Sequence, residues 1–220
     1  MEELSLTERT LVLIVSDHGE EFGDHFDVWN DGHGHSLYEE QVHVPFVVVG
    51  PTVPPGRRLA QAIDLTAVAP TVFSFLGVSP PALDGRDLLP LLRGERGESE
   101  WLAFSEDVWI GPSTWAARGA AWKLILQGDE FAERFLDSKR RRAIRTAVGR
   151  LEPEMLFYLP SDARERDNRL VREGERASSL RERLRTHVAA LSRPGGDRGG
   201  GQIAVEGEVV ERLRALGYVK

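Results

Sequence analysis

Cysteine is absent from the 220 residues. Without cysteine there is no disulfide framework, no thiolate metal site and no cysteine nucleophile within this sequence. The N-terminal residues also lack the basic start and apolar stretch of a signal peptide, and no apolar run approaches the length of a membrane span. The sequence therefore shows no recognisable targeting signal for a compartment or a membrane.

Clustered positive charge is also scarce. The formal net charge is -7, whereas a surface that binds nucleic acid needs grouped lysines and arginines that contact phosphates. A basic run at residues 139–142 stands beside acidic neighbours and is typical of a solvated helix face. We therefore expect no nucleic-acid partner.

Two continuous apolar runs lie near the N-terminus, at residues 10–15 and 44–49. Both are rich in β-branched residues and predict central strands of a parallel sheet that is buried on both faces. Between residues 64 and 76 the apolar positions have helical spacing, which predicts a helix that packs on the sheet and ends at Gly77. Pro70 implies either a kink or a helix that begins near Ala69. This part of the chain is typical of an α/β fold.

The pattern changes after residue 98. Short strand candidates separated by turns predict a small, mostly antiparallel unit, and apolar spacing in residues 178–191 predicts an amphipathic helix that covers it. A glycine-rich segment then has the composition of a flexible linker. The predicted division is a core at residues 1–98, an antiparallel α+β subdomain at 99–193, a linker at 194–207 and a C-terminal helix at 208–220.

Histidines are concentrated in one window. Five of the six fall between residues 18 and 43, among many acidic residues: His18, His25, His33, His35 and His43. Asp17 and His18 follow directly after the first predicted strand, which is where open α/β sheets place their ligands. A carboxylate next to an imidazole on a rigid element suits a divalent cation. The alternative is a solvated acidic loop with scattered histidines.

His33 and His35 form a second group, because alternate side chains point the same way in an extended segment. His43 directly precedes an apolar strand and is more typical of a packed or half-exposed histidine. Glu39 and Glu40 could pair with a base elsewhere in the fold, and we interpret them as structural.

Several motifs together resemble a known family. Residues 16–25, 33–40 and 42–48 are similar, in this order, to the central segment of bacterial sulfatases, which belong to the alkaline phosphatase superfamily. The resemblance continues through later motifs and departs from the family where Pro160 replaces an expected aspartate. These later motifs are residues 64–78, 84–92, 122–125, 154–170 and 213–218.

The resemblance implies an alkaline-phosphatase-like αβα sandwich, partial and lacking its N-terminal half, followed by a small α+β subdomain with an antiparallel sheet and a C-terminal helix. It implies that Asp17 and His18 bind a divalent metal ion. That ion is commonly calcium in sulfatases and often manganese or zinc in phosphoesterase relatives. The imidazole of His18 favours a softer metal than calcium. His33 or His35 would contact sulfate oxygens or protonate the leaving group.

The implied activity is metal-dependent hydrolysis of sulfate esters. This chain would supply part of the metal and oxyanion site, while the nucleophile would lie in the N-terminal half that the resemblance does not cover. The alternatives are a phosphoesterase, a phosphonate hydrolase or a phosphoethanolamine transferase of the same superfamily, or an inactive fragment. The expected partner is a sulfate- or phosphate-ester substrate.

The resemblance also implies a periplasmic, extracellular or membrane-attached location. Attachment to a membrane would require an N-terminal segment that this sequence does not show. The sequence does not indicate an oligomeric state.

Overall fold

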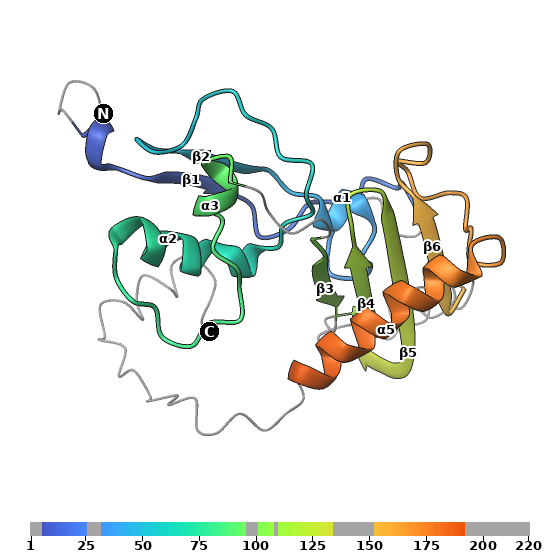
Figure 1. Cartoon of the computed structure of the whole chain (residues 1–220). Coiled ribbons are helices and arrows are strands. Elements are labelled where there is room, and N and C mark those ends of the chain that lie inside the picture. The colour runs from blue at the N-terminus through green and yellow to red at the C-terminus, as the bar shows by residue number, and fades with distance from the viewer. Residues whose placement is uncertain (1–5, 26–31, 96–100, 108–109, 134–151, 192–220) are drawn as a thin grey trace. The chain divides into compact units, whose positions relative to one another are not determined.

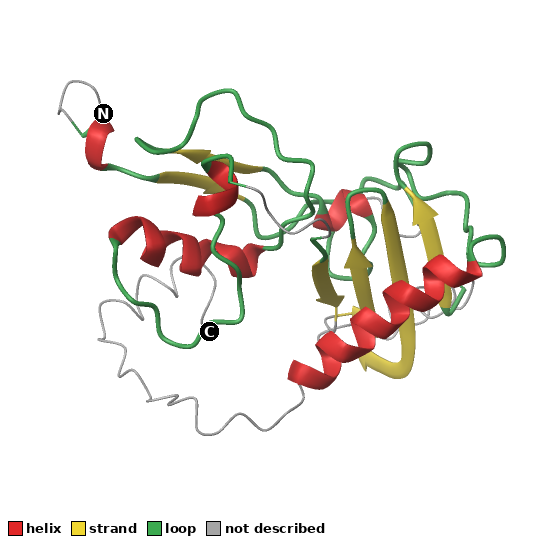
Figure 2. Cartoon of the chain, in the orientation of Figure 1, coloured by secondary structure: helices red, strands yellow, loops and turns green. Residues whose placement is uncertain are grey.

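The structure is a computed structural model that describes residues 6–25, 32–95, 101–107, 110–133 and 152–191. The strands are β1 (Val12–Val15), β2 (Phe46–Val49), β3 (Ala103–Asp107), β4 (Ile110–Arg118), β5 (Trp122–Glu133) and β6 (Glu154–Tyr158). The helices are α1 (Glu39–Val42), α2 (Val68–Leu76), α3 (Leu89–Leu92) and α5 (Gly174–Leu191), with single 3₁₀ turns at Thr7–Arg9 and Leu65–Ala67. Figures 1 and 2 show these elements along the chain.

The chain divides into compact units at Met1–Thr186 and His187–Lys220. The proposed boundary between residues 1–98 and 99–193 stays a prediction. Among the described residues, no helix is both long enough and apolar enough to cross a bilayer. The predicted linker, the predicted C-terminal helix at 208–220 and the basic run at 139–142 lie outside the described residues.

The first sheet corrects the prediction of parallel central strands. β1 and β2 pair antiparallel in a two-stranded sheet, with Val12 opposite Val49 and Ile14 opposite Val47. Ile14 is 56% exposed and Val49 is 55% exposed, so this face is not buried in the described structure. The prediction failed because an apolar run identifies a strand but carries no information about the direction of its neighbour.

The opposite face of this sheet is packed. Phe46 and Val48 lie against a core that contains Leu88 and Leu89, which are almost fully buried. α2 ends at Gly77, whose φ of 66° is the left-handed conformation that glycine adopts without strain. This confirms the predicted helix end. α2 begins at Val68, so Pro70 falls in the first turn, where its missing N–H costs nothing.

The second sheet is four-stranded and antiparallel, in the order β3-β4-β5-β6. This confirms the antiparallel unit that the short strand patterns predicted. α5 lies across one face of it (Figure 1), where Ala177 and Leu180 pack against Leu124 of β5 and Leu156 of β6. The amphipathic helix expected near residues 178–191 is therefore present and covers the sheet.

Side chains of β5 and β6 alternate between the two faces of this sheet, as strand geometry requires. Ile125 and Phe157 point to the face opposite α5, where they pack with Leu37 and Tyr38. Leu37 and Tyr38 directly precede α1. The histidine-rich segment is thereby fixed to the second sheet by an apolar contact.

We predict that Leu156→Ala destabilises the chain by about 2–5 kcal/mol, because Leu156 is fully buried between sheet and helix. Urea unfolding followed by circular dichroism measures the change. Val171→Ala is the control, since Val171 is 96% exposed and its truncation should change stability by less than about 0.5 kcal/mol. Equal losses in both variants would contradict the packing described here.

Candidate metal site

Two short segments carry the candidate ligands. Asp17, His18 and Glu20 follow directly after β1, and His33 lies in the segment that begins at Gly32. The Glu21 N–H donates to the carbonyl oxygen of Gly32 at 2.9 Å and joins the two segments. The rings of His18 and His33 are consequently stacked, with centroids 3.6 Å apart and planes 21° apart.

His18, Glu20 and His33 each offer a donor atom, and these three atoms lie within 4.8 Å of one another. Two ligands that each lie about 2.1 Å from a metal are at most about 4.2 Å apart. The three donor atoms therefore have to move closer together before they share one ion. Two imidazoles and a carboxylate form a donor set that suits zinc, manganese or cobalt. The residues fit a divalent cation.

Hydrogen bonds fix which ring nitrogens can bind a metal. His18 Nδ1 lies 2.9 Å from the Gly19 carbonyl oxygen, and His33 Nδ1 lies 2.7 Å from Glu20 Oε1. Both partners are acceptors, so both Nδ1 atoms donate and a neutral ring keeps its lone pair on Nε2. A carboxylate that holds a ligand histidine in this way orients the ring. Stacked rings direct their lone pairs along nearly parallel planes, so one ring must turn before both reach one ion.

Asp17 lies beside His18, as the sequence predicted. Its Oδ1 accepts from the His18 N–H at 3.1 Å and lies 3.8 Å from His18 Nε2. Hydrogen bonding from its own backbone amide, the charge of His18 and the amide of His18 lower the pKa of the Asp17 carboxyl. The side chain is 87% exposed. Asp17 is thus an ionised carboxylate next to the lone pair of His18.

A cavity of about 1860 Å³ has Asp17, His18 and His33 among its lining residues. Arg57, Arg58 and Arg118 also line it, so the wall carries cations that attract an anion. Both clustered histidines and Asp17 therefore face this cavity.

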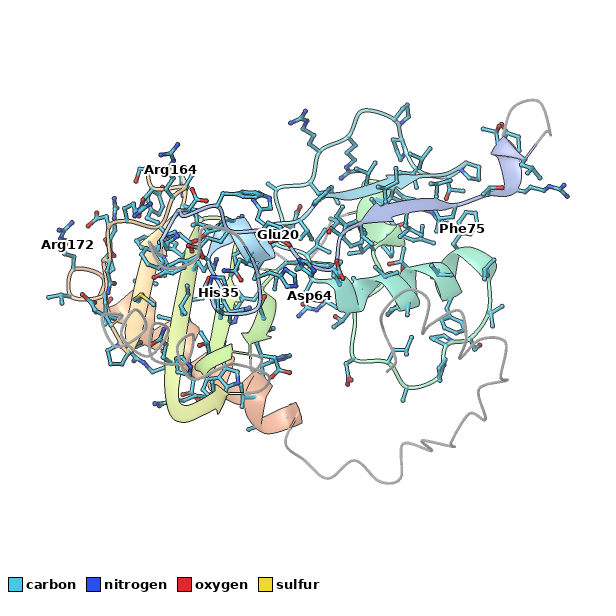
Figure 3. The ribbon with its side chains drawn as sticks, turned by 180° about the vertical axis from the view of Figure 1, so that it is seen from behind. Glu20, His35, Asp64, Phe75, Arg164 and Arg172 are labelled. Atoms are coloured by element: carbon cyan, nitrogen blue, oxygen red, sulfur yellow. The ribbon has the colours of Figure 1, made fainter. Side chains whose placement is uncertain are left out.

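The structure separates the two histidines that the sequence left as alternatives. His33 is exposed and lines the cavity, whereas His35 is buried and is absent from the lining. His35 Nε2 lies 2.8 Å from Glu21 Oε2, and both side chains are almost fully buried. Figure 3 shows Glu20 and His35 close to α1. His35 consequently supports the loop from behind, and the catalytic role stays a prediction for His33.

α1 is held in place by a buried ionic cluster. Glu39 lies 3.0 Å from Lys123 Nζ and 3.2 Å from Arg118 Nε, and Lys123 Nζ lies 2.9 Å from Glu165 Oε1. Burial alone would raise the pKa of Glu39, but the charges of Lys123 and Arg118 outweigh burial and lower it. The Glu39 N–H also donates to Glu165 Oε2 at 2.6 Å. Glu39 thus pairs with two basic residues, and these contacts fit its interpretation as a structural residue.

Sequence reasoning missed three residues of this region, namely Glu20, Gln41 and Lys123. Lys123 interrupts an apolar strand at a position that alternation places on an inner face. Its place on the inner face was the one available signal that the Lys123 side chain is buried and needs a carboxylate partner. Glu20 and Gln41 carried no comparable signal, because a polar residue in a polar loop is ordinarily solvated.

His25 packs behind the site. Its ring stacks on Tyr38 with centroids 3.6 Å apart, and its Nδ1 lies 2.6 Å from Glu40 Oε1. Burial lowers the pKa of His25, but the hydrogen bond that His25 donates to Glu40 and the charge of Glu40 outweigh burial, so the net shift is upward. Glu40, like Glu39, therefore pairs with a base.

Comparisons with known proteins identify proteins to which this chain is similar. A family model described as Sulfatase matches residues 1–78. The chain is 35% identical to the steryl-sulfatase of Mus musculus over 148 residues, which are 60% of this chain and 24% of that protein. The chain thus spans about a quarter of the length of this relative.

Two solved structures have a similar fold. One was solved in complex with its substrate D-glucosamine-2-N,6-O-disulfate; the TM-score is 0.64 at 17% identity, over 90% of this chain and 38% of that one. The other is the phosphonate monoester hydrolase of Agrobacterium radiobacter, with a TM-score of 0.63 at 24% identity, over 86% of this chain and 37% of that one. These likenesses confirm the partial alkaline-phosphatase-like α/β fold.

We predict that Glu40→Gln lowers the pKa of His25 below its ordinary value of 6.5, because burial then acts without a compensating carboxylate. A titration of the His25 ring resonances by NMR measures the shift. The raised pKa means that protonated His25 contributes stability that is fully present below pH 6.5 and is lost as pH rises through the folded-state pKa. Glu40→Gln should reverse the sign of this pH dependence, and an unchanged His25 titration would contradict the pairing.

Proposed function

We propose that this chain belongs to the sulfatase family of the alkaline phosphatase superfamily and that it supplies metal and oxyanion groups for the hydrolysis of sulfate esters. One observation carries the proposal. Within the matched residues 1–78, the loop after β1 and the residues around Gly32 bring His18, Glu20 and His33 together, and the two histidines line a cavity.

Sulfatases generally depend on a metal ion. We assign His18, Glu20 and His33 as ligands of a divalent cation, with the carboxylate of Asp17 beside them. Calcium, which the family resemblance favours, prefers six to eight oxygen donors. A set with two imidazoles is better matched to manganese or zinc. The donor set therefore moves our expectation from calcium towards these softer ions.

Hydrolysis of a sulfate ester concentrates negative charge on the leaving oxygen and on the peripheral oxygens. When bound, the cation supplies positive charge and Lewis acidity to that anion. Arg118 and Arg58 line the same cavity and add cationic groups that attract the substrate. His33 holds its Nδ1 proton on Glu20 and offers Nε2 to the cation, so proton donation to the departing oxygen is an alternative role that this imidazole has only when it is not a ligand. In this proposal the nucleophile comes from polypeptide outside these 220 residues, which contain no cysteine.

A second candidate function is hydrolysis of phosphate or phosphonate esters. The imidazole-rich donor set favours it, because His18 and His33 suit the manganese or zinc that phosphoesterase relatives use. Both substrate classes present a tetrahedral anion to the same cation and arginines. Ligand binding by the metal-loaded chain separates the two classes.

We predict that the full chain binds one Mn²⁺ or Zn²⁺ more tightly than Ca²⁺ in isothermal titration calorimetry. His18→Ala and His33→Ala should each weaken binding by about tenfold to a hundredfold, since each removes a donor. His43→Ala is the matched control, because His43 is an exposed histidine of the same region that is outside the donor cluster. Absence of binding, or equal binding by the unaltered chain and its three variants, would contradict the proposed site.

We also predict that phenyl sulfate raises the melting temperature of the metal-loaded chain, because a ligand that binds the folded state stabilises it. Phenylphosphonate is tested at equal concentration. A larger effect of phenyl sulfate supports the sulfatase assignment, and a larger effect of phenylphosphonate favours the second function. His33→Ala should reduce either effect, and an identical response in that variant would remove His33 from the oxyanion site.

A further inference from the structure

One side chain links the two segments that carry the proposed ligands. Gln41 belongs to α1 and is only 4% exposed. Its carbonyl oxygen accepts from the Gly19 N–H at 2.8 Å, and its side-chain Oε1 accepts from the Gly34 N–H at 2.9 Å. Gly19 is the neighbour of His18, and Gly34 is the neighbour of His33. Gln41 thus holds the backbone next to both imidazoles.

The other half of the Gln41 amide is also engaged. Nε2 lies 2.7 Å from Ser36 Oγ, 3.2 Å from Glu21 Oε2 and 3.1 Å from His35 Nε2. His35 Nε2 donates its own proton to the Glu21 carboxylate, which accepts only, so it has no lone pair for Gln41. The two amide protons of Gln41 therefore go to Ser36 and Glu21.

We propose that Gln41 is the positioning residue of this site and sets the distance between His18 and His33. The inference rests on the proposed metal-binding function. An amide of this length is required because the same side chain accepts from Gly34 and donates to Glu21 and Ser36. A carboxylate can accept but cannot donate, and an apolar side chain does neither.

The two ligand segments depend on Gln41 in different ways. Gly19 is held by the backbone carbonyl, and this contact survives any substitution of the side chain. A Cβ at Gly19 would lie 2.1 Å from the Glu40 carbonyl oxygen, so the segment that carries His18 lies directly against the backbone of α1. Gly34 and Ser36 are held by the side chain. Loss of the amide should therefore displace His33 while His18 stays in place.

The test compares cobalt binding by the full chain and its Gln41→Met variant, which keeps the length of the side chain and removes its polar atoms. Co²⁺ is the probe because its visible spectrum reports the number and type of ligands. We expect at least about tenfold weaker Co²⁺ binding and a spectrum that matches that of His33→Ala. Gln127→Met is the matched control, because Gln127 is a half-buried glutamine of β5 that makes none of these contacts.

A second variant tests whether the loss of Co²⁺ affinity comes from the lost hydrogen bonds and not from general destabilisation of the fold. Glu21→Gln combined with Gln41→Glu exchanges donor and acceptor across the 3.2 Å contact and leaves an acceptor for Gly34. This double variant should recover most of the Co²⁺ affinity that Gln41→Glu alone loses. A folded double variant that shows no recovery would overturn the positioning role.

The outcomes distinguish this inference from the proposed function. If the unaltered chain binds Co²⁺ and Gln41→Met gives the same affinity and spectrum, the positioning role is wrong while the metal site stands. If the unaltered chain binds no Co²⁺, the metal site fails, and the positioning role that rests on it fails too. Thermal melts of each variant show whether it is folded.

Discussion

The site depends on one buried ammonium group. Lys123 Nζ lies 3.0 Å from Glu39 and 2.9 Å from Glu165, and the lysine side chain is 1% exposed. An unpaired charge at such a position costs several kcal/mol, so the three groups are mutually required. Glu39 begins α1, Lys123 belongs to β5 and Glu165 lies in the turn after β6. One ionic cluster consequently fixes α1 to the sheet, and α1 carries the groups that support the proposed ligands.

The two carboxylates of this cluster respond to it in opposite directions. Burial raises the pKa of Glu165, and the attraction of Lys123 does not overcome it. Burial also acts on Glu39, but there the charges of Lys123 and Arg118 prevail and the pKa falls. Arg118 approaches Glu39 and also lines the cavity. It therefore belongs to both the structural cluster and the cavity wall, so a substrate anion would compete with Glu39 for the same guanidinium.

Sequence patterns predicted the parts of this structure that local chemistry determines. Asp17 and His18 were placed at a strand end because polar residues directly follow an apolar run, and the end of α2 followed from Gly77. The direction of pairing between β1 and β2 could not be predicted, because an apolar run does not reveal whether its neighbouring strand is parallel or antiparallel. Lys123 was missed because its carboxylate partner Glu39 lies 84 positions away, and no local pattern encodes that contact.

The exposure of the site residues suggests why polar contacts, and not apolar packing, support them. The His18 and His33 side chains are 40% and 49% exposed. Glu21 and Gln41 behind them are 0% and 4% exposed and hydrogen-bonded to both segments. A buried polar network tolerates few alternative arrangements, because each lost partner leaves a desolvated group. The network can thereby keep two water-facing segments at one spacing.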